Sequence, residues 1–145
     1  ELKKKLPDYI YSFPINKNEI TKAILSNKNN LKKINTTVHI KIRKRLKFFL
    51  KKNKNKKVII LDIPLLLENK INKKKDILVF VDSKKIDIER KIKKRINFNR
   101  KLFNKFKKIQ YSPRYKKKKS NFIIKNDFTK KSVKIRINYI LNEIL

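Results

Sequence analysis

Two short apolar runs, each ending in an aspartate, constrain the fold of this chain most strongly. The runs are VIILD at residues 58–62 and ILVFVD at residues 77–82. Both are rich in β-branched residues and lie between charged segments, which is typical of strands buried in a sheet. The 14 residues from 63 to 76 are enough for a crossover between parallel strands, which needs about a dozen. A third apolar run, NFIIKN at 121–126, predicts one more strand.

Apolar residues at steps of three and four predict helices around these strands. The predicted helices are one within 16–30, followed by a turn in the cluster NKNN, and four more at 31–50, 83–96, 102–109 and 129–144. Asp82 or Ser83 can cap the third of these helices, with Ile96 on its apolar face, and Asp127 or Thr129 can cap the last. The first 16 residues are predicted as a loop with at most a short helix, and residues 111–120 as a basic loop or frayed helix.

The order of these elements predicts an α/β fold with a mostly parallel sheet. Such sheets bind ligands at the carboxyl ends of their strands. Asp62, Asp82 and Asn126 are predicted to lie at those ends. From its position alone, Asp62 could hold Mg²⁺ beside a phosphate loop, or simply end a strand.

The charge of the chain has two interpretations. Lys and Arg number 44 against 11 Asp and Glu, which gives a formal net charge of +33. Such a charge attracts nucleic acid, acidic membrane surfaces and phosphates. Lys, Ile and Asn all have A/T-rich codons, however, so a genome rich in A and T would produce the same composition. Only seven of the cations are Arg, the residue best suited to bidentate phosphate and base contacts, which favours the codon interpretation.

Residue types that are absent exclude several kinds of site. The chain has no Cys and a single histidine, His39, so it has no disulfide, no thiol nucleophile and no all-histidine metal site. It has no Gly, so the glycine-rich phosphate loop and the dinucleotide fingerprint do not occur within these residues. Asn53 and Asn55, in the connector KKNKNKK, are candidates for the left-handed conformations that Gly would otherwise supply.

Membrane association is not expected from the sequence. No segment approaches the roughly 18 apolar residues of a membrane span. No apolar signal-peptide region follows the first residue, so a cytoplasmic location is expected. Because the chain has no Met and starts with Glu1, we expect it to be a processed product or a fragment.

Four segments, in order, resemble the dephospho-coenzyme A kinase family. KVIILDIPLLLEN is similar to that family's strand and turn, and ILVFVDSKKIDIERKIKKR to its next strand, helix and lid-entry arginine. IQYSPRYKKKKSNFIIKN resembles its lid and last strand, and INKNEITKAILSNKNNLKKINTTVHIKIRKRL its substrate-side helices. The resemblance covers roughly residues 15–145. It implies a three-layer phosphate-loop fold of the nucleotide-kinase type. It also implies an enzyme that uses Mg²⁺ and transfers the γ-phosphoryl group of ATP to the 3′-hydroxyl of dephospho-coenzyme A.

The resemblance also implies roles for individual residues. Asp62 would be the catalytic carboxylate that holds Mg²⁺ directly or through water, and Arg95 the lid arginine on the transferring phosphoryl group. Asn126 would border the adenine of ATP, and His39 would face the coenzyme A side. Gln110 and Lys116 would belong to the lid. Taken alone, a single histidine at the edge of an apolar helix face, such as His39, is more often a structural residue, and Arg95 could equally be a solvated charge at a helix end.

The chain departs from the family pattern in several places. Ile40 follows His39 where the family has Pro, Ser120 and Asn121 stand where it usually has Ala and Asp, and Asp127 stands where it usually has Gly. The family's first strand, phosphate loop and catalytic aspartate have no counterpart here.

The resemblance, together with the absence of the family's first strand and phosphate loop, predicts a single truncated kinase domain over residues 1–145. Its expected parts are substrate-side helices at 15–52, core strands and a helix at 58–95, a lid at 96–119, and the last strand and helix at 121–145. Without its phosphate loop, the chain as given is expected to be inactive.

A protein of another class remains the alternative. A small basic RNA-binding or ribosome-associated protein would explain the charge without any absent segment. It would not explain apolar strands that end in Asp at these positions.

Overall fold

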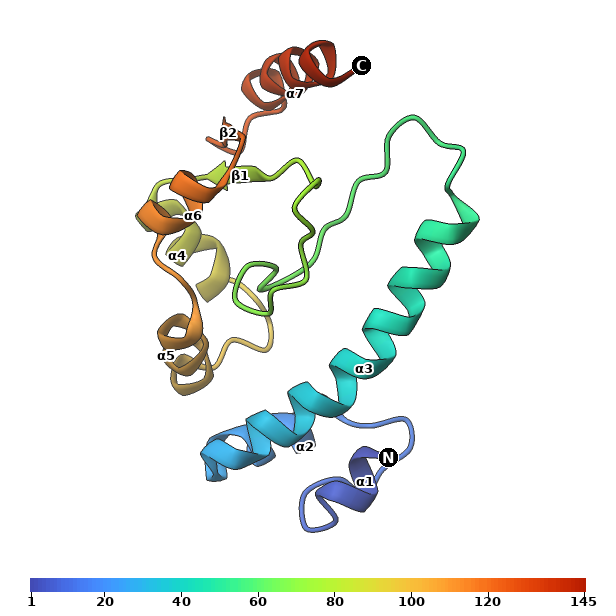
Figure 1. The fold of residues 1–145 in the computed structure, drawn as a ribbon. Helices are drawn as coiled ribbons and strands as arrows, with labels where there is room; N and C mark the ends of the chain where they lie inside the picture. Colours follow the sequence, from blue (N-terminus) through green and yellow to red (C-terminus); the bar gives the residue numbers. More distant parts are fainter. The chain divides into compact units, whose positions relative to one another are not determined.

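The computed structural model describes residues 1–145, which form two compact units, Glu1–Ile60 and Leu61–Leu145. The first unit is helical, and the second contains a small parallel sheet with helices (Figure 1). The predicted mixed α/β class with a parallel sheet is therefore confirmed. No helix in the chain is both long enough and apolar enough to cross a bilayer.

The first unit contains three helices: α1 (Leu2–Lys5), α2 (Lys17–Ser26) and α3 (Lys28–Lys52). Two asparagines cap the longer helices: the side chain of Asn16 accepts a hydrogen bond from Asn18 N at 2.8 Å, and that of Asn27 accepts one from Asn29 N at 2.9 Å. These caps satisfy backbone donors that a helix start leaves unpaired. The predicted pair of helices is confirmed, although α3 starts at Lys28, three residues earlier than expected.

Residues from α2, α3 and the N-terminal segment build the core of the first unit. Its buried apolar residues are Leu6, Ile10, Ala23, Ile24 and Ile34. Asn30 is also buried, and its Nδ2 donates to the carbonyl oxygen of Ala23 at 3.0 Å and to Ser26 Oγ at 3.3 Å. These bonds compensate for the loss of water around a buried amide and hold α3 against α2.

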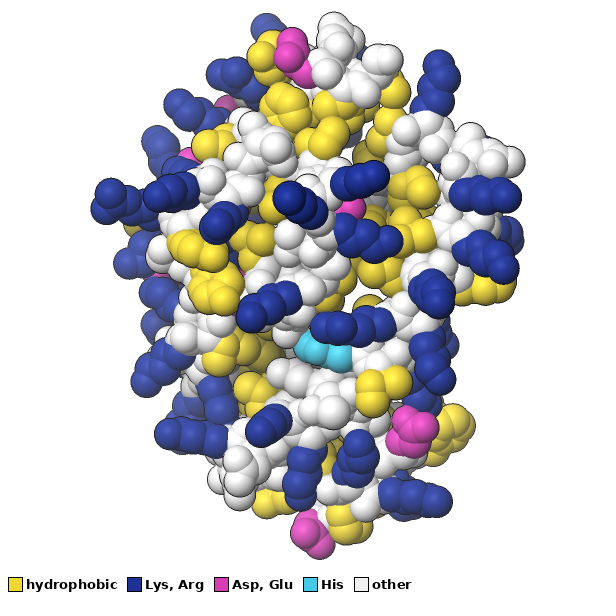
Figure 2. All heavy atoms as spheres, viewed as in Figure 1, with side chains coloured by type: hydrophobic (Ala, Val, Ile, Leu, Met, Phe, Trp, Pro, Cys, Tyr) yellow, Lys and Arg dark blue, Asp and Glu magenta, His cyan; other side chains and the backbone are white.

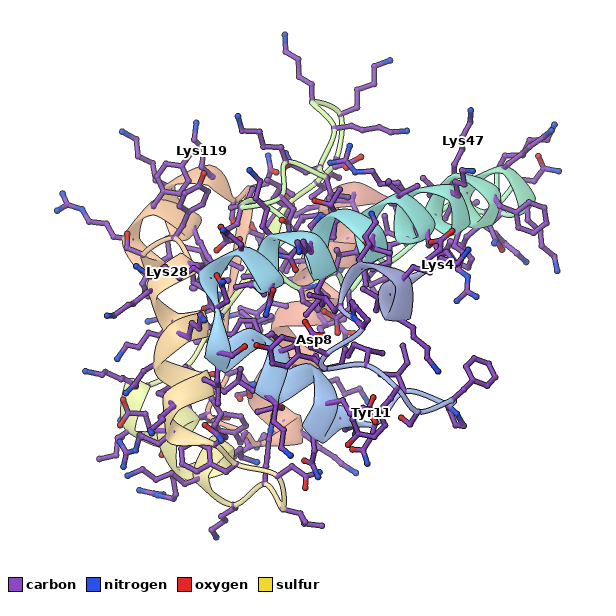
Figure 3. All side chains as sticks on the ribbon, turned by 90° about the horizontal axis from the view of Figure 1, so that it is seen from below. Lys4, Asp8, Tyr11, Lys28, Lys47 and Lys119 are labelled. Atoms are coloured by element: carbon purple, nitrogen blue, oxygen red, sulfur yellow. The ribbon has the colours of Figure 1, made fainter.

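Glu19 fastens the N-terminal loop to α2. Its Oε2 accepts hydrogen bonds from Tyr11 N at 3.2 Å and Ser12 N at 3.4 Å, and the residue is buried. Burial alone would raise the pKa of Glu19, but the bonds from Ser12 and Tyr11 and the nearby charge of Lys3 lower it. Elsewhere this unit is highly charged, and Figure 3 shows Lys47 extending outward from α3.

The second unit contains β1 (Val79–Asp82), α4 (Lys85–Lys93), α5 (Arg100–Ile109), α6 (Pro113–Lys119), β2 (Phe122–Lys125) and α7 (Lys130–Ile144). The strands pair in parallel, with Val79 opposite Phe122 and Asp82 opposite Lys125. α7 packs on β2 and α6 on β1. Ile124 and Ile140 are the buried apolar residues of this unit.

Hydrogen bonds at both ends of the strands lock this register. At the start of the strands, Leu78 O accepts from Asn121 N at 2.8 Å, and Leu78 N donates to Asn121 Oδ1 at 2.8 Å. At their end, Asn126 N donates to Asp82 O at 2.7 Å. A one-residue slip would break these bonds and turn Ile124 away from the core.

The predicted strand at 58–62 does not form. The sheet has two strands, and residues 58–63 have no regular structure. The side chain of Ile60 is 83% exposed. A strand is stable only when a neighbour pairs with its backbone groups, and no segment within residues 1–145 pairs with this run. The expected crossover between two paired strands is therefore also wrong, and residues 64–70 form turns instead.

Helix boundaries and left-handed residues differ from expectation in smaller ways. Lys84, rather than Asp82 or Ser83, is the N-cap of α4, and Ile96 lies beyond the end of that helix, fully exposed. Residues 113–119 form a true helix, because Ser112 Oγ accepts from Tyr115 N at 3.2 Å and Pro113 occupies its first position.

The residues with positive φ are not the expected asparagines. They are Leu65 (55°), Lys70 (50°) and Phe128 (67°). Because the chain has no Gly, residues with a Cβ atom must adopt these left-handed backbone conformations.

Candidate active site

The carboxyl ends of β1 and β2 bring two predicted polar residues together. Asp82 ends β1, and Asn126 directly follows β2 and donates its backbone N–H to the carbonyl oxygen of Asp82. The side-chain oxygen of Asn126 accepts from Phe128 N at 2.8 Å, which turns the chain toward α7. This edge, defined by Asp82 and Asn126, is called the carboxyl edge below.

A lysine of α6 lies at the carboxyl edge. Lys117 Nζ is 2.6 Å from Asp82 Oδ2, and the two side chains keep 38% and 28% of their surface exposed. The same ammonium group lies 6.0 Å from the centre of the Phe80 ring. The edge thus presents a carboxylate, an amide and an ammonium group that solvent and ligands can reach.

Glu68 holds the other side of α6. Its Oε1 lies 2.8 Å from Lys116 Nζ and accepts a hydrogen bond from Tyr111 N, also at 2.8 Å. The side chains of Lys116 and Glu68 are only 21% and 9% exposed. Burial tends to raise the pKa of Glu68, but the bonds from Lys116 and Tyr111 lower it, so the carboxylate is charged at neutral pH.

Asp127 organises the start of α7. Its Oδ1 accepts from Thr129 N at 2.8 Å, Thr129 Oγ1 at 2.7 Å and Ser132 Oγ at 2.6 Å. These bonds, with the one from Ser132 the strongest influence, lower the pKa of Asp127 to about 2. The sequence predicted Asp127 or Thr129 as the cap. The cap residue is Thr129, while the carboxylate of Asp127 makes the hydrogen bonds.

Three other predicted site residues of the second unit, Asp62, Arg95 and Gln110, are not bonded to the carboxyl edge. Asp62 is exposed in irregular chain, so its expected place at a strand end is wrong. Arg95 is exposed in the turn after α4, and Gln110 is exposed at the C-cap of α5. No hydrogen bond or ion pair joins these three residues to Asp82 or Asn126. His39 is partly buried in α3, which belongs to the first unit.

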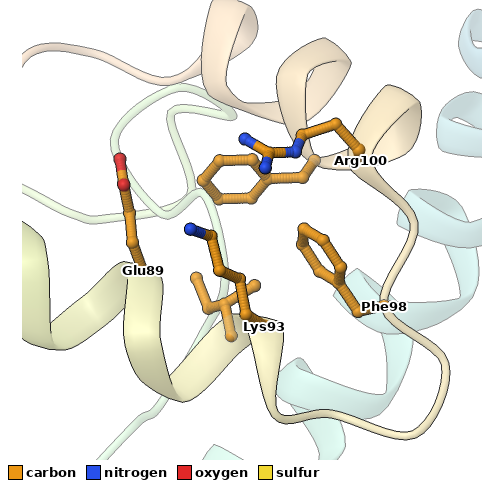
Figure 4. A pocket seen from close by; sticks show the side chains of 6 residues that line it. Glu89, Lys93, Phe98 and Arg100 are labelled. Carbon is orange, nitrogen blue, oxygen red and sulfur yellow. The ribbon is translucent and has the colours of Figure 1, made fainter.

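A shallow hollow lies beside the turn that holds Arg95. Its lining comes from Glu89, Ile92, Lys93, Phe98, Arg100 and Phe103 (Figure 4). The rings of Phe98 and Phe103 are 6.1 Å apart, and the guanidinium of Arg100 lies 6.0 Å from the Phe98 ring. These contacts join the segment before α5 to α5, and the hollow that they border leaves little room for a ligand.

Two residues near the carboxyl edge and α6 were not identified individually from the sequence: Glu68 was not singled out, and Lys117 was included only as part of the basic segment 111–120. Each pairs with a residue far along the chain, and Tyr111 lies 43 positions from Glu68. Local periodicity carries no signal for such pairs. A lone glutamate in a turn and one lysine in a run of four are each what a solvated surface would also contain.

The donor set bears on how a metal ion could bind. The chain gathers no group of three or more His, Asp or Glu side chains that could hold a metal ion. Mg²⁺ in kinases is usually held by one or two carboxylates together with substrate phosphates and waters, so it needs no such cluster. A single carboxylate such as Asp62 fits that mode of binding.

The small parallel sheet, with helices packed on its strands and polar groups at its carboxyl edge, places this chain in the α/β class. Comparison with known proteins gives the family. The family model for dephospho-CoA kinase matches residues 13–132. The chain belongs to the dephospho-CoA kinase family, whose members are ATP-dependent kinases.

Individual relatives agree with this assignment. The dephospho-CoA kinase of Wolbachia pipientis wMel is 29% identical over 143 residues, covering 97% of this chain and 73% of that protein. That of Fusobacterium nucleatum is 35% identical over 116 residues, covering 78% and 58%. That of Bartonella quintana is 24% identical over 120 residues, covering 81% and 62%. The matches favour the kinase over the RNA-binding alternative, and the chain spans about three fifths to three quarters of these relatives.

Proposed function

We propose that this chain supplies the lid, the substrate-side helices and part of the core of an enzyme that transfers the γ-phosphoryl group of ATP to the 3′-hydroxyl of dephospho-coenzyme A. The products are coenzyme A and ADP. The family match over residues 13–132 carries this proposal. The carboxyl edge, where Asp82, Asn126 and Lys117 lie beside one another, supports this proposal, because open parallel sheets bind their nucleotide ligands at that edge.

The proposed catalytic machinery is Arg95 and Asp62. Arg95 would stabilise the charge on the transferring phosphoryl group. Electrostatic stabilisation of this kind is usually the largest single contribution to catalysis of phosphoryl transfer. Asp62 would hold Mg²⁺ directly or through water, and the ion would neutralise charge on the ATP phosphates. Both side chains are exposed, so either can meet a ligand.

The remaining roles follow the same resemblance. Asn126 would border the adenine, His39 would contact dephospho-coenzyme A, and Gln110 and Lys116 would belong to the lid. The full fold would be the three-layer phosphate-loop type. Its phosphate loop would come from outside residues 1–145, because these residues contain no Gly.

The test is formation of coenzyme A from ATP and dephospho-coenzyme A, followed by mass spectrometry. We expect product from the protein made from its complete gene and none from residues 1–145 alone. Product from the 145-residue chain would contradict the proposed dependence on an outside phosphate loop. No product from either protein would overturn the proposed function.

A matched pair of variants tests the catalytic arginine. In the complete protein, Arg95→Ala should lower kcat by about a thousandfold, the low end of what an arginine on a transferring phosphoryl group contributes. Arg136→Ala, which removes an equally exposed arginine from α7, should change kcat less than twofold. Equal effects would remove Arg95 from the site, and unchanged melting temperatures would show that both variants fold.

A further inference from the structure

α6 carries a row of adjacent lysines whose charges are used differently. Lys116 and Lys117 each pair with a carboxylate, from Glu68 and Asp82 respectively, while Lys118 and Lys119 are exposed. Figure 2 shows how widely Lys and Arg side chains cover one face of the molecule, so a cation alone is no distinction here. Lys116 and Lys117 are distinguished by the carboxylates with which they pair.

Lys116 is committed to its carboxylate. Its pair with Glu68 is largely buried, and the same oxygen of Glu68 also accepts from Tyr111 N. Moving Lys116 to a ligand would leave a nearly buried carboxylate without its cation, which is costly. Lys116 therefore anchors α6 in the second unit and is poorly suited to contact phosphate.

Lys117 is in the opposite situation. Both members of its pair remain about one third exposed, so water can replace either partner at small cost. The pair lies at the carboxyl edge, where parallel sheets bind their ligands. A polyphosphate carries more negative charge than Asp82 and presents several oxygens, so it can compete with that single carboxylate for the ammonium group.

We propose that Lys117 is a phosphate-binding residue that Asp82 holds at the carboxyl edge until a polyphosphate ligand displaces the carboxylate. The ligand class is the triphosphate chain of a nucleotide or inorganic tripolyphosphate, and the proposal rests on the proposed kinase function for the choice of ATP. In this arrangement Asp82 keeps Lys117 oriented in the unbound protein and opposes phosphate binding. Removing Lys117 and removing Asp82 should therefore change affinity in opposite directions.

The experiment is a titration of residues 1–145 with tripolyphosphate at 150 mM salt, followed by NMR at the Asn126 amide. The Asn126 N–H donates a hydrogen bond to the backbone carbonyl oxygen of Asp82, so its chemical shift reports binding at the carboxyl edge rather than at distant lysines. We expect Lys117→Met to weaken binding five- to tenfold and Lys118→Met, its exposed neighbour, less than twofold. Asp82→Asn should tighten binding two- to fourfold.

A double variant separates direct competition from a general change of charge. If Asp82 acts by holding Lys117, the gain from Asp82→Asn disappears in the Lys117→Met background. A gain in affinity that persists there would overturn the proposal that Asp82 competes with polyphosphate for Lys117. A weaker affinity in Asp82→Asn would show that the Asp82–Lys117 pair has only a structural role. Equal effects of Lys117→Met and Lys118→Met would also overturn the proposal.

Kinase assays on the complete protein separate this proposal from the proposed function. Formation of coenzyme A with an unchanged KM for ATP in Lys117→Met would contradict the role of Lys117 and leave the kinase function intact. Tripolyphosphate binding that depends on Lys117, in a protein that forms no coenzyme A, would support the phosphate site and contradict the kinase function.

Discussion

The apolar runs at 58–62 and 122–125 have similar composition and different structures. VIILD is irregular and exposes Ile60, while FIIK forms β2 and buries Ile124. β2 has a parallel neighbour, a helix packed on it, and an asparagine at each end whose hydrogen bonds fix its register. The run at 58–62 has none of these, which shows that an apolar β-branched run becomes a strand through its partners.

The largest difference between the two runs should appear when each receives a charge. Ile124→Asp places a carboxylate among buried side chains without a partner and should cost about 3 kcal/mol or more of unfolding free energy. Ile60→Asp, at an 83% exposed position, should cost no more than about 0.5 kcal/mol. Chemical denaturation followed by circular dichroism measures both. Equal losses would mean that the 58–62 run is buried in solution.

The next effect tests the register lock at the start of β2. Asn121→Ala removes the oxygen that accepts from Leu78 N and should cost about 1 kcal/mol. Amide exchange at Leu78 should speed up, while exchange at Asn126, at the other end of the strands, should change much less. Asn97→Ala, in the turn after α4, is the control. Unchanged protection at Leu78 would contradict this role for Asn121.

A smaller change, a gain in stability, is expected from placing a Gly in the turns that follow residues 58–62. Lys70 is exposed and has a φ of 50°, a conformation that disfavours residues with a Cβ. Lys70→Gly should therefore raise the unfolding free energy by about 0.5 kcal/mol, the relief being partly offset by a more flexible unfolded chain. Lys73→Gly, also exposed, should be neutral or destabilising. A loss on Lys70→Gly would contradict the strain.

The smallest effect concerns the helix that follows β2. The folded pKa of Asp127, about 2, lies below its ordinary value of 3.8, so its stabilising contribution is complete above pH 3.8. That contribution is lost as the pH falls through 2. The amide of Thr129 should lose protection over this window, and Asp127→Ala should abolish that pH dependence. A variant with the same acid profile as the parent would contradict the assignment.

Helices were more predictable from the sequence than strands or the site. The period of apolar residues located α2, α3, α5 and α7, because a helix satisfies its backbone hydrogen bonds within one segment. Two of the three predicted strands formed, and the third did not, because strand pairing depends on a distant segment. At the site, the sequence correctly placed Asp82 and Asn126 at strand ends. It could not show that Glu68 pairs with Lys116 or that Asp82 pairs with Lys117.

The sequence by itself determined the helical periodicity, the large positive charge and the lack of any glycine loop within these 145 residues. It also carried enough of the family pattern to indicate a dephospho-CoA kinase. Only the tertiary structure decided which apolar run pairs as a strand and which of two adjacent lysines is neutralised by a nearly buried carboxylate. These outcomes depend on segments about 40 residues apart in the chain meeting in space, and residue type and local spacing do not contain that information.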